Sequence, residues 1–163
     1  MKTTISNYLT FILIVGLVSC NDKEKGNRAY IKSELPVIEK CIRDAIGWAG
    51  KKDFDLLYSV IANDSNYLEV SPNNHITRGF EEFKKNEVIW GDPRFKAIGY
   101  EIRDLKISVS QSGTVAWYYC ILDDINDWDS KPASWMNTRW TGVLEKRKEK
   151  WVIVQMHFSF AKE

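Results

Sequence analysis

Apolar residues recur at helical spacing in the first half of the chain and alternate with polar residues in the second half. The first periodic stretch predicts a helix that begins near Ser33 and closes at Gly50. A second, short helix is expected after Asp53, a residue that often caps helix N-termini, and a third is expected over Phe80–Trp90. The apolar positions of the first helix are Ile38, Cys41, Ile42, Ala45 and Ala49.

Strand periodicity appears first in Asn66–Ser71, where Tyr67 and Glu69 share one side. From Phe95 onward it continues, with a shift of phase near Asp104. Thr114–Leu122 is apolar on both faces, which is typical of a central strand.

The polar run Asp123–Ser134 predicts a long loop, and Trp135–Phe160 predicts a hairpin whose turn is the charged segment at 145–150. Helices followed by four or five antiparallel strands indicate an α+β fold, with helices on one face of a sheet.

The N-terminus has the pattern of a targeting signal. Lys2 precedes an apolar run over Tyr8–Val18, which is too short to span a bilayer comfortably. The run ends in Leu-Val-Ser-Cys, which resembles a bacterial lipobox with Cys20 as the lipidated residue. We therefore expect a signal peptide at 1–19, a flexible tether at 20–32, and one domain at 33–163. The protein would then be lipid-anchored in the bacterial cell envelope, on the periplasmic or outer-membrane face; an ordinary secretory signal or an uncleaved anchor is the alternative.

Charge and cysteine content exclude several classes. Removal of residues 1–19 takes away one basic residue, Lys2, and leaves 22 basic against 22 acidic residues, a balance that argues against nucleic-acid binding. Cys41 and Cys120 are expected to be buried thiols rather than a disulfide pair. We expect no metal site, because no Cys/His cluster is present and the acidic run after Leu122 lacks the Gly and Glu of an EF-hand. No dinucleotide or phosphate-binding motif occurs, and no cofactor is expected.

Three segments carry a resemblance to a known family. They are KDFDLLYSVIAND (52–64), RGFEEF (78–83) and RWTGVLEKRKEKWVIVQMHFS (139–159). Their order resembles the nuclear transport factor 2-like superfamily in its SnoaL-like branch, and the last segment also resembles the association domain of calcium/calmodulin-dependent protein kinase. The resemblance implies a cone-shaped, curved antiparallel sheet wrapped around N-terminal helices (a cystatin-like roll), one pocket, and a homodimer formed through the sheet. Because this superfamily includes isomerases, cyclases, dehydratases and binding modules, the fold does not decide the function.

Arg139 and His157 are polar residues in the middle of predicted strands, where a charge is costly to bury unless it is paired. The resemblance places their face, with Thr141, toward the pocket. Arg139 would bind an anionic group, and His157 would bind ligand or transfer a proton. The alternatives are a polar network that fixes strand register, or an arginine on the dimer surface.

Glu69 is the other candidate acid–base residue. It is the fifth residue after Asp64, and the same count reaches the catalytic carboxylate in ketosteroid isomerase-like sequences. A carboxylate buried among aromatic residues would have a raised pKa. However, the tyrosine donor of those enzymes corresponds to Ala45 here, and an exposed glutamate on an edge strand is the alternative.

Aromatic residues are abundant and are expected to line the pocket for a flat or ring-shaped ligand. The candidates are Trp48, Tyr67, Trp90, Trp117 and Tyr119, with Trp135 as a further one. The sequence thus favours a membrane-tethered module that binds a small organic molecule, with an anion as one option. The alternatives are an isomerase, cyclase or dehydratase that uses Glu69 or His157, and a dimeric protein-interaction module.

Overall fold

The computed structural model describes residues 12–161 and, within its first helix, side chains from Lys25 onward. The chain divides into two compact units, and the boundary along the chain lies between residues 34 and 35. The described part of the first unit is entirely helical and belongs to α1 (Ile12–Gly47). Among residues 12–161, no helix combines the length and the apolar character that a membrane span requires.

Helix α1 begins much earlier than the sequence predicted. It includes residues 20–32, the expected tether, and it contains Pro36 in its interior. Ser33 does not cap a helix start; its hydroxyl donates to the carbonyl of Tyr30 at 2.7 Å, one turn back. Residues 1–11 of the expected signal peptide lie outside the described residues, as does the side chain of Cys20. Signal cleavage and lipidation therefore stay predictions.

The second unit contains the end of α1 and four shorter helices. These are η1 (Trp48–Lys51), α2 (Phe54–Val60), α3 (Phe80–Lys84) and α4 (Glu87–Trp90). Asp53 caps α2 as expected, since its carboxylate accepts a hydrogen bond from the Leu56 N–H at 2.9 Å. The predicted helix over 80–90 is divided in two, at Lys85 and Asn86.

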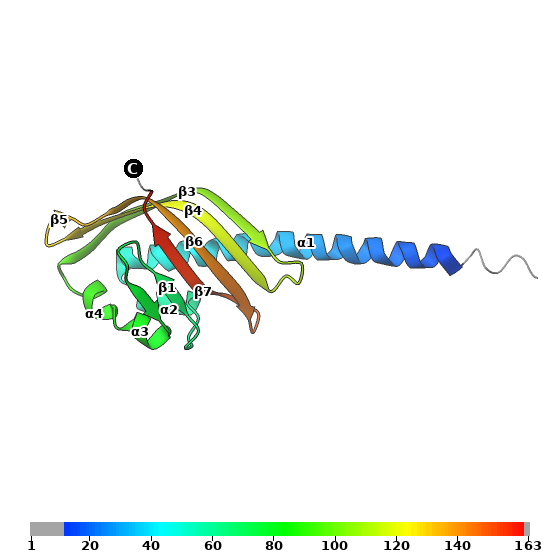
Figure 1. Cartoon of the computed structure of the whole chain (residues 1–163), viewed down its shortest axis with the longest axis horizontal. Helices are drawn as coiled ribbons and strands as arrows, with labels where there is room; N and C mark the ends of the chain where they lie inside the picture. The colour runs from blue at the N-terminus through cyan, green and yellow to red at the C-terminus, as the bar shows by residue number, and fades with distance from the viewer. Residues whose placement is uncertain (1–11, 162–163) are drawn as a thin grey trace, which may run out of the picture. The chain divides into compact units, whose positions relative to one another are not determined.

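The sheet of the second unit curves over these helices (Figure 1). In spatial order its strands run β2-β1-β7-β6-β4-β3, and β5 pairs with β4. The strands are β1 (Leu68–Val70), β2 (Ile76–Arg78), β3 (Phe95–Val109), β4 (Val115–Trp128), β5 (Lys131–Pro132), β6 (Trp135–Arg147) and β7 (Lys150–Ser159). The α+β cone expected from the resemblance is confirmed, but the sheet is mixed because β1 runs parallel to β7.

Strand β4 is longer than the sequence predicted. It continues through the run expected to be a loop and turns only at Asp129 and Ser130, both with positive φ. Asp123 and Asn126 are buried in this extension. The polar composition of the run therefore reflects a buried polar site, and not a solvent-exposed loop.

Besides a register shift between Ala97 and Gly99 in β3, three β-bulges interrupt the long strands. The predicted change of phase at Asp104 is confirmed: its φ is 53° and the register with β4 shifts there. A second bulge lies at Asn137 in β6, also with φ 53°. The third is at Val154 in β7, where Val143 pairs with Gln155 but Leu144 pairs with Ile153. Each bulge adds one residue to its strand and so exchanges the two faces beyond it.

The core lies between the concave face of the sheet and the helices. Its largest buried members include Ile38 and Ile42 from α1, Leu122 from β4 and Trp140 from β6. Cys41 and Cys120 are buried free thiols, as predicted, and burial raises the pKa of each to about 12.

Gly142 tests how tightly the sheet is packed. A Cβ at this position would lie 2.5 Å from the Tyr118 ring and 2.7 Å from the Gln155 carbonyl oxygen. We expect Gly142→Ala to lower the free energy of unfolding by about 1–3 kcal/mol, because the fully buried Tyr118 ring has little room to move. The measurement is urea denaturation. Gly99→Ala is the control, since a Cβ there meets nothing within 4 Å; equal midpoints for the two variants would contradict the packing argument.

Candidate functional site

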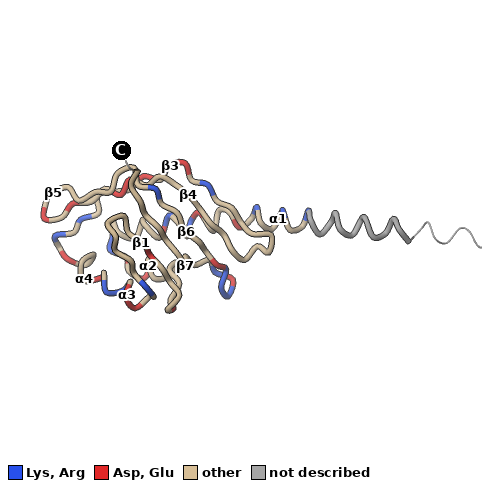
Figure 2. Tube along the Cα trace, in the orientation of Figure 1, with Lys and Arg blue, Asp and Glu red and all other residues tan. Residues whose placement is uncertain are grey.

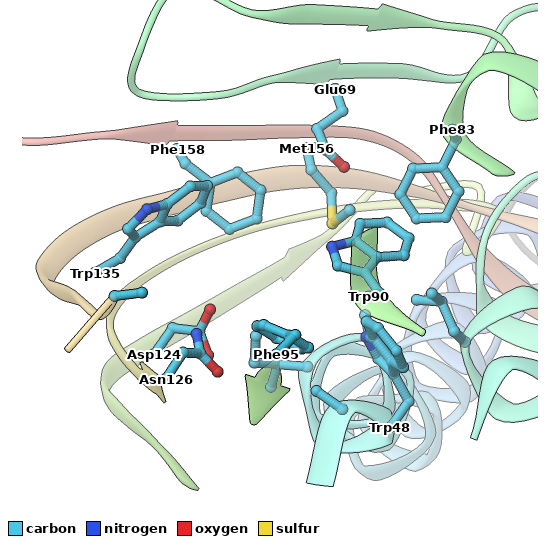
Figure 3. Close-up of a pocket in the computed structure, with 15 residues that line it drawn as sticks. Trp48, Glu69, Phe83, Trp90, Phe95, Asp124, Asn126, Trp135, Met156 and Phe158 are labelled. Carbon is cyan, nitrogen blue, oxygen red and sulfur yellow. The ribbon is translucent and has the colours of Figure 1, made fainter. Parts of the chain in front are cut away.

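A cavity of about 210 Å³ lies between the helices and the concave face of the sheet (Figure 3). Six aromatic rings and three polar side chains contribute to its lining. The aromatic residues are Trp48, Phe83, Trp90, Phe95, Trp135 and Phe158, and the polar ones are Glu69, Asp124 and Asn126. Ala45, Ile46, Ala49, Leu57, Ala133 and Met156 complete it.

The aromatic rings hold one another in place. Trp90 lies 5.2 Å from the centroids of both Trp48 and Phe83, so η1, α3 and α4 contribute one packed group. On the sheet side, Trp135 packs edge-on against Phe158 at 5.5 Å. Rings fixed in this way form a rigid wall, which suits a preformed binding site.

Glu69 points into the cavity from β1 and is only 8% exposed. The alternative of an exposed glutamate on an edge strand is wrong, because β1 is flanked by β2 and β7. The hydroxyl of Tyr67 donates to Glu69 Oε2 at 3.0 Å. Burial raises the pKa of Glu69 above its usual range, although the Tyr67 and Ser71 hydroxyls and the nearby His75 act in the opposite direction.

Asp124 and Asn126 lie side by side on β4, away from Glu69 (Figure 3). Burial raises the pKa of Asp124 as well. The backbone of Asn126 exchanges two hydrogen bonds with the Ser134 hydroxyl, at 3.0 and 3.1 Å. Within the described part of the chain, the buried side-chain oxygen of Asn126 has no hydrogen-bond partner. It is therefore an unused hydrogen-bond acceptor in a residue that lines the cavity.

Sequence reasoning missed Asp124 and Asn126 because it assigned them to a loop. A usable signal was present: both continue the even-numbered alternation of Tyr118, Cys120 and Leu122, which face the core.

The bulge at Asn137 places Trp135 in the cavity. Beyond the bulge, Trp135 pairs with Asp124 and takes the inward side. The carboxylate of Asp123 holds the bulge, since it accepts the Asn137 N–H at 2.6 Å and the Arg103 guanidinium at 2.7 Å. Arg103 also donates to the Asn137 side chain at 3.0 Å.

Of the residues predicted for the pocket, four line the cavity: Glu69, Trp48, Trp90 and Trp135. Tyr67 is buried behind Glu69 and contacts it through the hydroxyl. Their roles in binding or catalysis stay predictions. Among the described residues, no group of three or more His, Cys, Asp or Glu side chains could hold a metal ion.

The other predicted pocket residues lie on the opposite face of the sheet, so their placement in the pocket was wrong. They are Arg139, His157, Thr141, Trp117 and Tyr119. On β7, the Val154 bulge moves His157 to the face opposite Trp151 and Ile153, which are buried. The inward residues of β4, and of β6 after the Asn137 bulge, are the even-numbered ones, including Tyr118 and Trp140.

On this outer face the predicted pair is also separated in register. Arg139 pairs with Ser159, and its guanidinium donates to the Phe160 carbonyl; His157 pairs with Thr141. Trp117 and Tyr119 are 50% and 39% exposed there. The expected homodimer through the sheet stays a prediction.

The fold, with its aromatic cavity between the helices and the sheet, is that of a nuclear transport factor 2-like (NTF2-like) α+β domain. Residues 38–163 match the family model of the SnoaL-like domain, and the chain therefore belongs to the SnoaL-like family. No curated protein matches the chain.

Solved structures share the fold at low identity. A candidate scytalone dehydratase from Novosphingobium aromaticivorans has 14% identity and a TM-score of 0.71, over 83% of this chain and 89% of that one. A candidate dehydratase of the NTF2-like family from Streptomyces avermitilis has 15% identity and a TM-score of 0.70, over 81% and 99%. A candidate calcium/calmodulin-dependent kinase II association domain from Exiguobacterium sibiricum has 9% identity and a TM-score of 0.63, over 80% and 95%.

The raised pKa of Glu69 has a consequence for stability. Between the unfolded pKa of about 4.3 and the higher folded value, the folded state binds more protons, so stability falls as pH rises through this window. We expect Glu69→Gln to remove that part of the decline in urea midpoints measured across the pH range. The exposed Glu101→Gln is the control and should keep the wild-type slope; a Glu69→Gln profile parallel to wild type would contradict the assignment.

Proposed function

We propose that this domain binds a small organic molecule with one ring inside the aromatic cavity. The observation that carries the proposal is the combination of six packed aromatic rings with polar groups at separate places in the lining. Such a lining gives affinity through apolar contact and orientation through a few hydrogen bonds. A dry cavity of about 150 Å³ accommodates benzene, so about 210 Å³ suits one ring with short substituents.

An anionic ligand fits this cavity poorly. Neither Arg139 nor any other Lys, Arg or His is among the lining residues, and both charged side chains of the lining are carboxylic acids. An anion would meet two acids without a compensating cation. The proposal therefore keeps the small organic ligand but not the negative charge.

The setting of the domain is a further part of the proposal. Lipid on Cys20 would hold it in the bacterial cell envelope, and the exposed Trp117 and Tyr119 on the outer face would support a homodimer. Neither feature changes the cavity lining.

Ala133 offers a direct test because it lines the cavity and is itself exposed. Ala133→Phe is expected to obstruct the cavity where it meets solvent, and to do so with little strain, since Ala133 is exposed and not packed in the core. One-ring fragments should raise the melting temperature of wild type but not of Ala133→Phe, because only ligand that binds the folded state stabilises it.

Ala133→Ser is the matched control and should respond as wild type does. Native mass spectrometry of the purified protein adds a second readout, in which any retained small molecule should be lost from Ala133→Phe only. Equal stabilisation of wild type and Ala133→Phe by every responding fragment would refute binding in this cavity, as would the absence of any response in wild type.

Proton-transfer catalysis is the second candidate function, favoured by the buried carboxyl of Glu69. A carboxyl with a raised pKa in an apolar cavity can act as a general base or acid near neutral pH. By the family resemblance, Ala45 in the lining corresponds to the tyrosine donor of related isomerases, so the described lining has no tyrosine at this position. Among the described lining groups, the acid–base role rests on Glu69 and Asp124.

Deuterium exchange next to the carbonyl of a small cyclic ketone tests this candidate without knowledge of the substrate. NMR in D₂O should show exchange catalysed by wild type and reduced by about 10²-fold or more in Glu69→Gln. Glu101→Gln should exchange at the wild-type rate. If the Glu69 variant matched wild type, Glu69 would not be the base.

A further inference from the structure

The charges in the cavity are of one sign although the chain as a whole is nearly neutral. The formal net charge is +1, and basic and acidic residues are interspersed along the elements (Figure 2). In the cavity, both ionisable side chains are acids: Glu69 from β1 and Asp124 from β4. The excess of carboxyl groups is therefore a local property of the cavity.

The two carboxyl groups differ in their surroundings. Glu69 accepts the Tyr67 hydroxyl on Oε2. Asp124 accepts a hydrogen bond from the Asn126 side chain, which partly offsets the effect of burial on its pKa. The side-chain oxygen of Asn126, a residue only 6% exposed, has no partner among the described residues. A carboxylate and an amide oxygen together suit a group with several N–H donors.

Aromatic rings line the cavity between Glu69 and Asp124 (Figure 3). Trp90, Phe95 and Trp135 come from three different elements and surround the same cavity. The face of an aromatic ring attracts a cation, and Trp does so most strongly. Aromatic walls with nearby carboxylates are the surroundings that stabilise an organic ammonium ion away from water.

We propose that the ligand of this cavity is a ring-bearing organic amine whose ammonium group donates hydrogen bonds to Asp124 and Asn126. The proposal rests on the proposed function and names its ligand class. The ring lies among the aromatic side chains, and Glu69 marks the other end of the cavity. A second cavity of about 150 Å³, beside the β3 segment 97–100, also has Asp124 in its lining and leaves room for a substituent on the nitrogen.

The pH dependence of binding follows from the same geometry. The titratable groups around Asp124 are Tyr100, its partner on β3, and Glu69 across the cavity; Asn126 beside it is neutral. A bound ammonium ion favours the ionised carboxylate, so amine affinity should rise with pH through the raised pKa of Asp124. It should fall again only where the amine loses its own proton, near the pKa of about 10 that is usual for alkyl amines.

Benzylamine, benzyl alcohol and benzoate test the proposal because they share a ring and differ in charge. Calorimetric titration of the full chain near neutral pH should show benzylamine binding at least about tenfold tighter than benzyl alcohol, and benzoate weakest. Asp124→Asn, which keeps the side-chain shape, should remove most of the amine's advantage and leave the alcohol unaffected. The exposed Glu101→Gln is the control and should leave all three affinities unchanged.

The outcomes separate the ligand class from the binding function. If benzyl alcohol binds wild type as tightly as benzylamine, or if Asp124→Asn does not weaken the amine, the cation proposal is overturned while the cavity remains a binding site. If none of the three binds wild type, this ligand class is refuted; the proposed function fails as well only if Ala133→Phe and wild type also respond alike to the wider fragment set.

Discussion

The curvature of the sheet is the constraint on which the rest of this structure depends. Flat strands would carry their alternation unchanged from end to end and could not enclose a space against the helices. The bulges at Asp104, Asn137 and Val154 break that alternation. Beyond two of them, the inward face acquires Trp135, Met156 and Phe158, all of which line the cavity. The residues that bend the sheet thus also select the side chains that enclose the site.

The same bulges set the limit of what the sequence could predict. The shift at Asp104 could be predicted because the apolar residues move from even-numbered to odd-numbered positions there. At Val154 nothing marks the change, since Trp151 to Phe158 is apolar at most positions and reads equally well in either phase. An alternation carried through without the bulge put His157 on the face of Trp151, whereas the structure places it opposite. The undetected bulge therefore explains the wrong face predicted for His157. The wrong face predicted for Arg139 and Thr141 came from the family resemblance.

Glu69 and Asp124 show how composition both helps and misleads. Glu69 was found because its distance along the chain from Asp64 matches that of the catalytic carboxylate in ketosteroid isomerase-like sequences, although an exposed position on an edge strand remained an alternative. Asp124 was missed because a cluster of acids normally indicates solvent, and only the pairing of β4 with β3 and β6 shows that the strand continues. The order of the elements could be predicted because it depends on average periodicity rather than on the orientation of single residues. The start of α1 and the division of the helix over 80–90 could not. The family resemblance came from three specific segments.

The two carboxyl groups in the cavity lower the stability of the folded domain when no ligand is bound. Burial favours the neutral form of each, and neither has a basic partner in the lining. A domain that needed only to fold would be more stable with apolar side chains at both positions. Membership in a fold family with many activities does not explain why this chain keeps two carboxyl groups that lower its stability. A ligand would explain the arrangement if it supplied hydrogen-bond donors and a positive charge, which the cavity lining lacks beside Asp124. A cation next to Asp124 and Asn126 would pair with the carboxylate and donate to the unpartnered amide oxygen.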